Sequence, residues 1–188
     1  VERFVGGPTD YRIEQVNPMV DYVGWGGDGP KPSGMISVGG VLYLAYQNLC
    51  HMKLPVTGTK SQHGSDSVIA ASRDSGRTWD PDIKKLGKGN PTFPGPRFGG
   101  PAFVNYGRDN EGAVDGWVYA VSTDQWDNGG HLLLGRVSPE AITSADKWQW
   151  VCGVDGANEP QWTSRLDLAQ AVYSDDRWIG LPEMVYLA

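Results

Sequence analysis

Eight consecutive residues, Ser72 to Trp79, constrain the fold of this chain more than any other segment. Asp74 can accept hydrogen bonds from the backbone amides of a tight turn, and Gly76 can adopt the left-handed conformation that such turns require. Thr78 then resumes an extended strand, and the indole of Trp79 can pack between neighbouring sheets. The segment therefore predicts a turn that joins two strands of an antiparallel sheet.

The composition favours the same kind of structure. The 188 residues include 26 Gly, 13 Pro, 8 Trp and 8 Tyr, a profile typical of many short strands joined by tight turns. No Ser-rich, Pro-rich or charged linker divides the chain, and all-β domains commonly reach this length. We therefore predict a single all-β domain over residues 1–188.

The first group of predicted strands lies on either side of this turn. Gly34 to Val38 and Val41 to Gln47 are predicted strands, joined by the two-residue hairpin loop Gly39-Gly40. Asp66 to Arg73 is the predicted third strand. Pro81 to Leu86, beyond the turn, is a weak edge strand that its Pro helps to protect. These residues form a first four-stranded unit.

The pattern then repeats along the chain. The second predicted unit consists of Pro101 to Tyr106, Gly116 to Ser122, His131 to Val137 and Lys147 to Cys152, with Trp148 in the place of Trp79. A third unit begins with Ala171 to Tyr173 and Trp178 to Gly180, which lead into Leu181 to Leu187 as another innermost strand.

Repeated four-stranded antiparallel units predict a β-propeller. Ser72 to Trp79 supports this fold, because it matches the Asp-box pattern Ser-x-Asp-x-Gly-x-Thr-Trp at every fixed position. The box closes the turn between the third and fourth strands, on the outer rim of a blade. We therefore expect structural roles for Ser72, Asp74, Gly76, Thr78 and Trp79, which makes Asp74 a poor catalytic candidate.

In a propeller, the entrances to the innermost strands converge on one end of the central channel. The three predicted entrances are Lys31 to Met35, Arg97 to Pro101 and Gly180 to Met184, and each combines Gly or Pro with a polar side chain. These three segments are therefore expected to face one cavity.

Several short motifs resemble one known family in the same order along nearly the whole chain. They are Lys31 to Met35, Val41 to Tyr43, Asn105 to Gly107, Asp115 to Tyr119, Leu134 to Val137 and Pro182 to Tyr186. These segments are similar to the five-bladed propeller family of formerly unknown function that includes bacterial endo-D-arabinanases. The resemblance implies a glycoside hydrolase that cleaves arabinofuranosyl linkages in polysaccharides.

The start of the chain departs from that family. The family pattern has a blade before the Lys-Pro-Ser-Gly segment, whose Asp-rich inner hairpin is thought to supply catalytic carboxylates. Here residues 1–30 include Asp10, Asp21 and Asp28 without that pattern. We therefore expect about two blades plus parts of flanking ones, in a propeller domain incomplete at both ends.

Glycoside hydrolysis ordinarily needs two carboxyl groups, one protonated as the acid and one ionised as nucleophile or base. Glu183 is the first candidate, because it lies at a predicted entrance, where partial burial could raise its pKa. Alternatively, Glu183 is an ordinary surface residue, or it pairs with Arg97 or Lys31. Asp124 is the second catalytic candidate.

Polar and aromatic residues near Asp124 suggest a sugar-binding loop. Trp126 and Asp127 follow it, and an indole can cover the apolar face of a sugar while carboxylates bind its hydroxyls. The alternative is that these are solvated loop residues. Lys31, Ser33 and Arg97 complete the predicted substrate-binding set, although the two basic residues could instead neutralise acids.

No cofactor is expected, and the pattern predicts no metal site. Asp109, Asp115, Asp124 and Asp127 could supply oxygen ligands to Ca²⁺, but they lack the alternation of an EF-hand loop. His51, His63 and His131 lack the close pairing of zinc ligands. Cys50 and Cys152 permit one disulfide or two free thiols.

Net charge and hydropathy limit the partners. A net charge of -6 argues against nucleic acid and anionic membranes, and the apolar runs are too short to span a bilayer. A polysaccharide or oligosaccharide is the expected partner, in a secreted or cell-surface location. A homodimer could cover the open sheet edges.

Two other functions compete with the hydrolase. One is a non-catalytic glycan-binding or interaction module built on a partial propeller, favoured by the departure at the start of the chain. The other is a sialidase-type enzyme, which ranks last because its site needs clustered arginines and only Arg97 lies at a predicted entrance.

Overall fold

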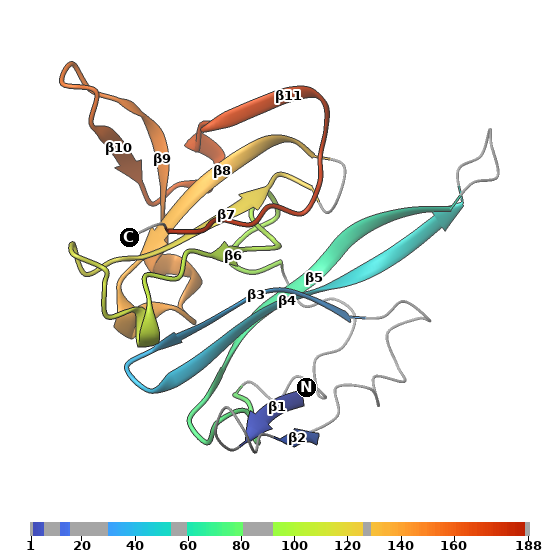
Figure 1. The fold of residues 1–188 in the computed structure, drawn as a ribbon. Coiled ribbons are helices and arrows are strands. Elements are labelled where there is room, and N and C mark those ends of the chain that lie inside the picture. The colour runs from blue at the N-terminus through green and yellow to red at the C-terminus, as the bar shows by residue number, and fades with distance from the viewer. Residues whose placement is uncertain are drawn as a thin grey trace.

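The computed structural model describes residues 2–5, 12–15, 30–53, 60–80, 92–125 and 129–186. These residues form antiparallel β-sheets with a few single-turn 3-10 helices (Figure 1). The all-β class predicted from composition and turn chemistry is therefore confirmed. In the described part of the chain, no helix has the length and apolarity needed to cross a membrane.

The first sheet has the strand order β3-β4-β5. Its strands are β3 (Pro30–Val38), β4 (Val41–Lys53) and β5 (Lys60–Ser72). The predicted hairpin is present: Gly39 and Gly40 have φ of 59° and 77°, a left-handed backbone that glycine adopts without steric cost. Pro30, the first residue of β3, pairs with Asn48. Past this point strands β4 and β5 pair only with each other and continue as a long two-stranded arm (Figure 1).

The second sheet has the strand order β10-β9-β8-β7-β6, with β11 also paired to β8. Its strands are β6 (Ala102–Phe103), β7 (Val118–Thr123), β8 (Gly129–Val137), β9 (Gln149–Val154), β10 (Pro160–Thr163) and β11 (Tyr173–Ile179). The first four lie within or overlap the predicted strands of the second unit. β10 is a strand that the sequence pattern did not predict.

The end of the chain differs from the predicted third unit. β9 pairs with β8 only at Gly135 and Arg136, so the rest of that edge of β8 is open to another strand. β11 takes this place, pairing with Leu132 and His131. The expected innermost strand from Leu181 is absent among residues 181–186, where Val185 makes one isolated parallel bridge. The apolar run was misread because short runs carry no clear period.

The remaining elements are short. β1 (Glu2–Val5) and β2 (Arg12–Gln15) form a two-stranded antiparallel sheet. The 3-10 helices of the described chain are η3 (Arg108–Asn110), η4 (Pro139–Ala141), η5 (Ala145–Lys147) and η6 (Leu166–Leu168). The predicted edge strand Pro81 to Leu86 lies outside the described residues, although Asp80 forms a bridge to Ala71.

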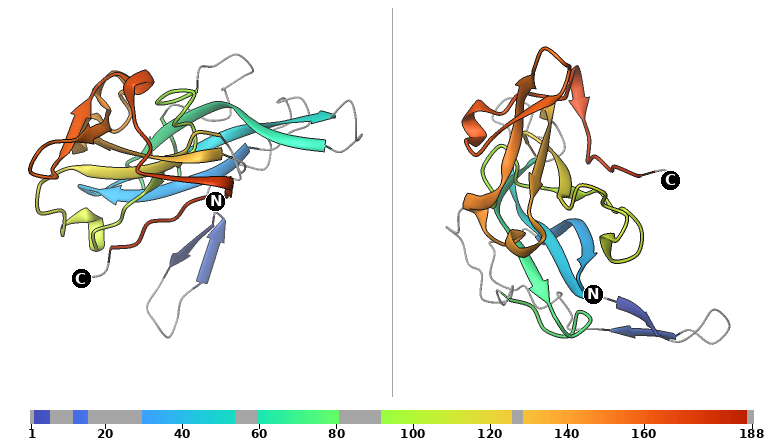
Figure 2. Two further views of the ribbon diagram at one scale, coloured as in Figure 1. Left: turned by 90° about the horizontal axis from the view of Figure 1, so that it is seen from above. Right: turned by 90° about the vertical axis from the view of Figure 1, so that its left-hand side faces the viewer.

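One hydrophobic core joins the first and second sheets, whose arrangement can be followed in Figure 2. Ile36 and Ile69 contribute from the first sheet and Leu133 and Val137 from the second. Trp148 is fully buried in this core, and its indole N–H donates to the Ile142 carbonyl at 3.1 Å. The two sheets therefore share their buried face.

Gly34 sets the closest approach between the two sheets. A Cβ at this position would lie 2.5 Å from the carbonyl oxygen of Pro101 and 3.0 Å from Cα of Ala102. Both atoms are backbone and cannot turn aside. The absence of a side chain on β3 therefore permits the contact with β6.

Substituting Gly34 should loosen this contact. We expect Gly34→Ala to lower the free energy of unfolding by about 1–3 kcal/mol, because the added methyl forces the strands apart. Urea denaturation measures the loss. Gly180→Ala is the matched control, since a Cβ there would meet no described atom within 4 Å. Equal stability of the two variants would contradict the close approach.

A carboxylate also ties the second sheet's connection to the first sheet. Asp109, in η3, accepts a hydrogen bond from the Ser37 hydroxyl at 2.6 Å. It also accepts from the Gly40 amide, at 2.8 Å and 3.0 Å to its two oxygens. The Ser37 bond and then the Gly40 bond hold the pKa of Asp109 below its usual range. Asp109 thus acts as a clamp on the β3–β4 hairpin.

The clamp predicts a pH dependence. A lowered carboxyl pKa stabilises the fold above the pKa of the unfolded chain, and the stabilisation is lost as pH falls through the folded pKa. The Asp109→Asn variant should therefore have a lower melting temperature than the parent at pH 7, and this difference in melting temperature should shrink below about pH 4. Thermal melting curves of parent and variant, recorded from pH 7 to below pH 4, check this pH dependence, with Asp176→Asn on β11 as the control. A difference that does not change with pH would contradict an ionic clamp.

Candidate functional site

The Asp-box residues form a closed hydrogen-bonded turn. The Ser72 hydroxyl donates to Asp74 Oδ1 at 2.8 Å and accepts from the Gly76 amide at 2.8 Å. The Thr78 amide and hydroxyl donate to the two Asp74 oxygens at 2.8 Å and 2.7 Å. Gly76 has φ of 85°, and Trp79 is buried beside the first sheet. Ser72, Asp74 and Thr78 are hydrogen-bonded to one another, and the ring of Trp79 packs against the first sheet, where its indole N–H has no hydrogen-bond partner within the described chain.

These hydrogen bonds also determine the ionisation state of Asp74. The hydroxyl and amide of Thr78 lower its pKa to about 2. Asp74 therefore stays ionised near neutral pH and cannot serve as a general acid there. The turn is a structural device rather than a reactive centre.

Removing the Ser72 hydroxyl tests how strongly the turn depends on it. Ser72 is buried, and the Gly76 amide that it accepts from is buried too. Ser72→Ala leaves that amide unpaired, so we expect a loss of about 1–3 kcal/mol in unfolding free energy. Chemical denaturation measures this loss. The control is Ser164→Ala, which removes an exposed hydroxyl. A loss no greater than that of the control would show that the amide finds another partner.

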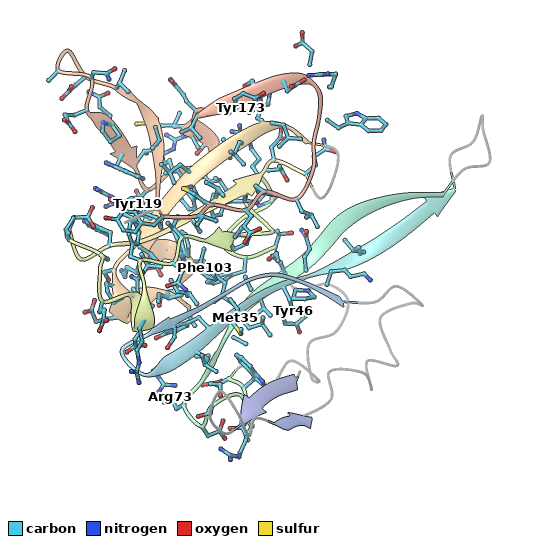
Figure 3. All side chains as sticks on the ribbon, in the orientation of Figure 1. Met35, Tyr46, Arg73, Phe103, Tyr119 and Tyr173 are labelled. Carbon is cyan, nitrogen blue, oxygen red and sulfur yellow. The ribbon has the colours of Figure 1, made fainter. Side chains whose placement is uncertain are left out.

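A pocket of about 330 Å³ lies between the two sheets and the end of the chain. Its walls come from β3, β6 and the segment after β11, and Figure 3 labels Met35 and Phe103 on the two strands. The lining residues are Ser33, Gly34, Met35, Ala102, Phe103, Leu181, Pro182 and Glu183. Two of the three predicted entrances, near Ser33 and near Glu183, therefore border one cavity.

The pocket combines apolar surface with two polar groups. Met35 and Leu181 are 57% and 56% exposed, and Phe103 is buried behind them. The Ser33 hydroxyl donates to the Pro101 carbonyl at 3.3 Å. Such a mixture can cover the apolar face of a small ligand and bind its polar groups.

Glu183 supplies the carboxylate of the pocket. It is exposed, so the partial burial considered from the sequence is not found. The reason is that residues 181–186 run along the rim without joining a sheet. Within the described part of the chain, Glu183 makes no ion pair with Arg97 or Lys31.

The other predicted binding residues occupy different places. Lys31 is exposed on β3 and does not line the pocket. Arg97 is half-buried beside η6, where Nη1 donates to the Leu166 carbonyl at 3.5 Å. Trp126 and Asp127 lie outside the described residues.

Asp124 closes the hairpin between β7 and β8. Its Oδ1 accepts from the His131 amide at 3.2 Å, and its own amide donates to the His131 carbonyl at 3.0 Å. A Cβ at Gly129 would lie 2.5 Å from the same carboxylate oxygen. The structure thus places Asp124 in a hairpin contact, outside the pocket that holds Glu183.

A layer of buried polar residues was missed by the sequence reasoning. Gln47 and Ser67 are buried in the middle of β4 and β5, and Ser122 is buried near the end of β7. Gln47 follows Tyr43 and Ala45 at spacing two, which places it on the face that packs against the second sheet. A polar residue at a core-facing strand position was the signal that could have found it.

A second missed feature lies on β7, β8 and β10. The Arg136 guanidinium lies 4.3 Å from the ring centre of Trp117 and 4.0 Å from that of Trp162. The neighbouring Tyr119, labelled in Figure 3, donates its hydroxyl to Asp115 at 2.5 Å. Burial, and then this hydrogen bond, raise the pKa of Tyr119 to about 12. These contacts pack the sheet face.

Cys152 is a free thiol. Among the described residues, no group of three or more His, Cys, Asp or Glu side chains is placed to hold a metal ion. Asp109 and Asp115, considered as calcium ligands, instead bind Ser37 and Tyr119.

Comparison with models of known protein families finds no match to the chain. Comparison with curated proteins also finds no match. The function is therefore argued from the pocket and its residues.

Proposed function

We propose that this chain is a carbohydrate-active protein built on a β-propeller of four-stranded blades, related to the five-bladed family that includes bacterial endo-D-arabinanases. The contact between β3 and β6 at Gly34 supports this arrangement, since innermost strands of adjacent blades meet around a propeller axis. The antiparallel order of each sheet also fits successive blades.

One observation carries the functional proposal. Ser33 and Glu183 come from segments far apart in the chain and line the same pocket. That pocket offers a hydroxyl, a carboxylate and exposed apolar side chains. A neutral sugar presents hydroxyls along its edges and an apolar ring face, so its chemistry complements this lining.

In this proposal the reaction is hydrolysis of an arabinofuranosyl linkage by paired carboxyl groups. Glu183 supplies one carboxyl group and Asp124 the other. Asp124 would have to leave its contact with the His131 amide, or share it, when substrate binds. Lys31, Arg97, Trp126 and Asp127 remain proposed contacts for the outer parts of a polysaccharide.

The test measures oligosaccharides released from D-arabinan by the parent and by Glu183→Gln. We expect the rate to fall about 10²–10⁴-fold, since the amide can neither donate an acidic proton nor attack. Glu159→Gln, at an exposed turn after β9, is the matched control and should keep full activity. Full activity in Glu183→Gln would remove this residue from the mechanism.

A non-catalytic glycan-binding module is the second candidate. It is favoured because Glu183 is the one carboxylate among the described residues that line the pocket, whereas hydrolysis ordinarily uses two. This candidate gives saturable binding of arabinan oligosaccharides by the parent and by Glu183→Gln, with no release of product from either protein.

A further inference from the structure

Gln47 presents a buried hydrogen-bond acceptor that no described group satisfies. The residue lies on β4 and is 5% exposed. Its Oε1 is buried and has no hydrogen-bond partner within the described chain. Buried polar atoms are nearly always paired, so an unpaired one in a folded protein needs an explanation.

The amide of Gln47 lies directly behind the Ser33 corner of the pocket. A Cβ built on Gly100 would lie 3.6 Å from Gln47 Oε1 and 3.6 Å from Ser33 Cβ. Apart from Gly100 itself and its two chain neighbours, no other described atom lies within 4 Å of that point. Glycine at position 100 therefore places no side chain between the unpaired acceptor and Ser33, a residue of the pocket wall.

Three serine hydroxyls beside Gln47 or Gly100 are already committed to other acceptors. Ser67, the cross-strand neighbour of Gln47, donates to the Phe93 carbonyl at 2.8 Å. Ser122 donates to the Thr123 carbonyl at 2.9 Å, and Ser33 donates to Pro101. A donor for Gln47 Oε1 is therefore best supplied from outside the protein.

We propose that Gln47 Oε1 accepts a hydrogen bond from a hydroxyl of a neutral sugar that enters the pocket past Ser33 and lies over Gly100. An uncharged acceptor suits a hydroxyl, because a carboxylate would be repelled and a buried ammonium would lose its hydration without compensation. This inference rests on the proposed function and deepens it. It makes Gln47 a recognition residue for the sugar.

The first experiment fills the space without touching Gln47. In Gly100→Ala the added methyl makes only ordinary contacts, and the backbone at this position does not require a left-handed conformation. The melting temperature should therefore match the parent. Affinity for arabinan oligosaccharides, measured by calorimetry, should fall roughly tenfold. Gly156→Ala, where a Cβ meets no described atom within 4 Å, is the matched control.

The second experiment removes the acceptor. Gln47→Met keeps the shape of the side chain and eliminates the unpaired oxygen, so the melting temperature should rise by about 2–6 °C. Affinity for the same oligosaccharides should fall. Opposite changes in stability and binding are not expected of a residue with a purely structural role. Gln170→Met, at an exposed position, is the control and should change neither quantity.

The outcomes separate this inference from the proposed function. If the parent binds and both variants bind equally well, the role of Gln47 is overturned while the proposed function stands. If the parent binds no arabinan oligosaccharide, the proposed function is overturned and the inference falls with it. A lower melting temperature for Gln47→Met overturns the inference whatever the parent binds, because it shows that the amide stabilises the protein without a ligand.

Discussion

The contact of two backbones at Gly34 is the constraint on which the rest of the structure depends. Because β3 carries no side chain there, it can approach Pro101 and the start of β6 closely enough for the two sheets to share one core. The same contact places Ser33 and Met35 on one wall of the pocket. Fold and candidate site are thus consequences of one close approach.

Local chemistry made much of the fold predictable. The hairpin at Gly39 and Gly40 and the turn from Ser72 follow from residues that specify their own backbone conformation, and both are found where the sequence places them. β10 and β11 were harder to predict. β10 folds back on β9 through the turn from Asp155 to Glu159, whereas β11 pairs with β8 where β9 leaves it, a partner that tertiary packing decides.

The candidate site was predictable only in part, for similar reasons. The expectation that Ser33 and Glu183 face one cavity agrees with the pocket, although residues 181–186 reach it without forming the predicted strand. The repeat pattern could not show that Arg97 would bind the Leu166 carbonyl, since that contact comes from an unpredicted 3-10 helix. Gln47 was missed because its unpaired amide oxygen is visible only in three dimensions.

The return of β11 to β8 has a consequence for the order in which the molecule assembles. Glu183 follows β11 closely, and Val185 bridges to Asn105, so the rim of the pocket depends on pairings between segments far apart in the chain. Such contacts carry the largest loop-closure entropy and form slowly. The rim of the pocket is therefore completed later than local hairpins such as those at Gly39-Gly40 and between β7 and β8, whose strands meet across short loops.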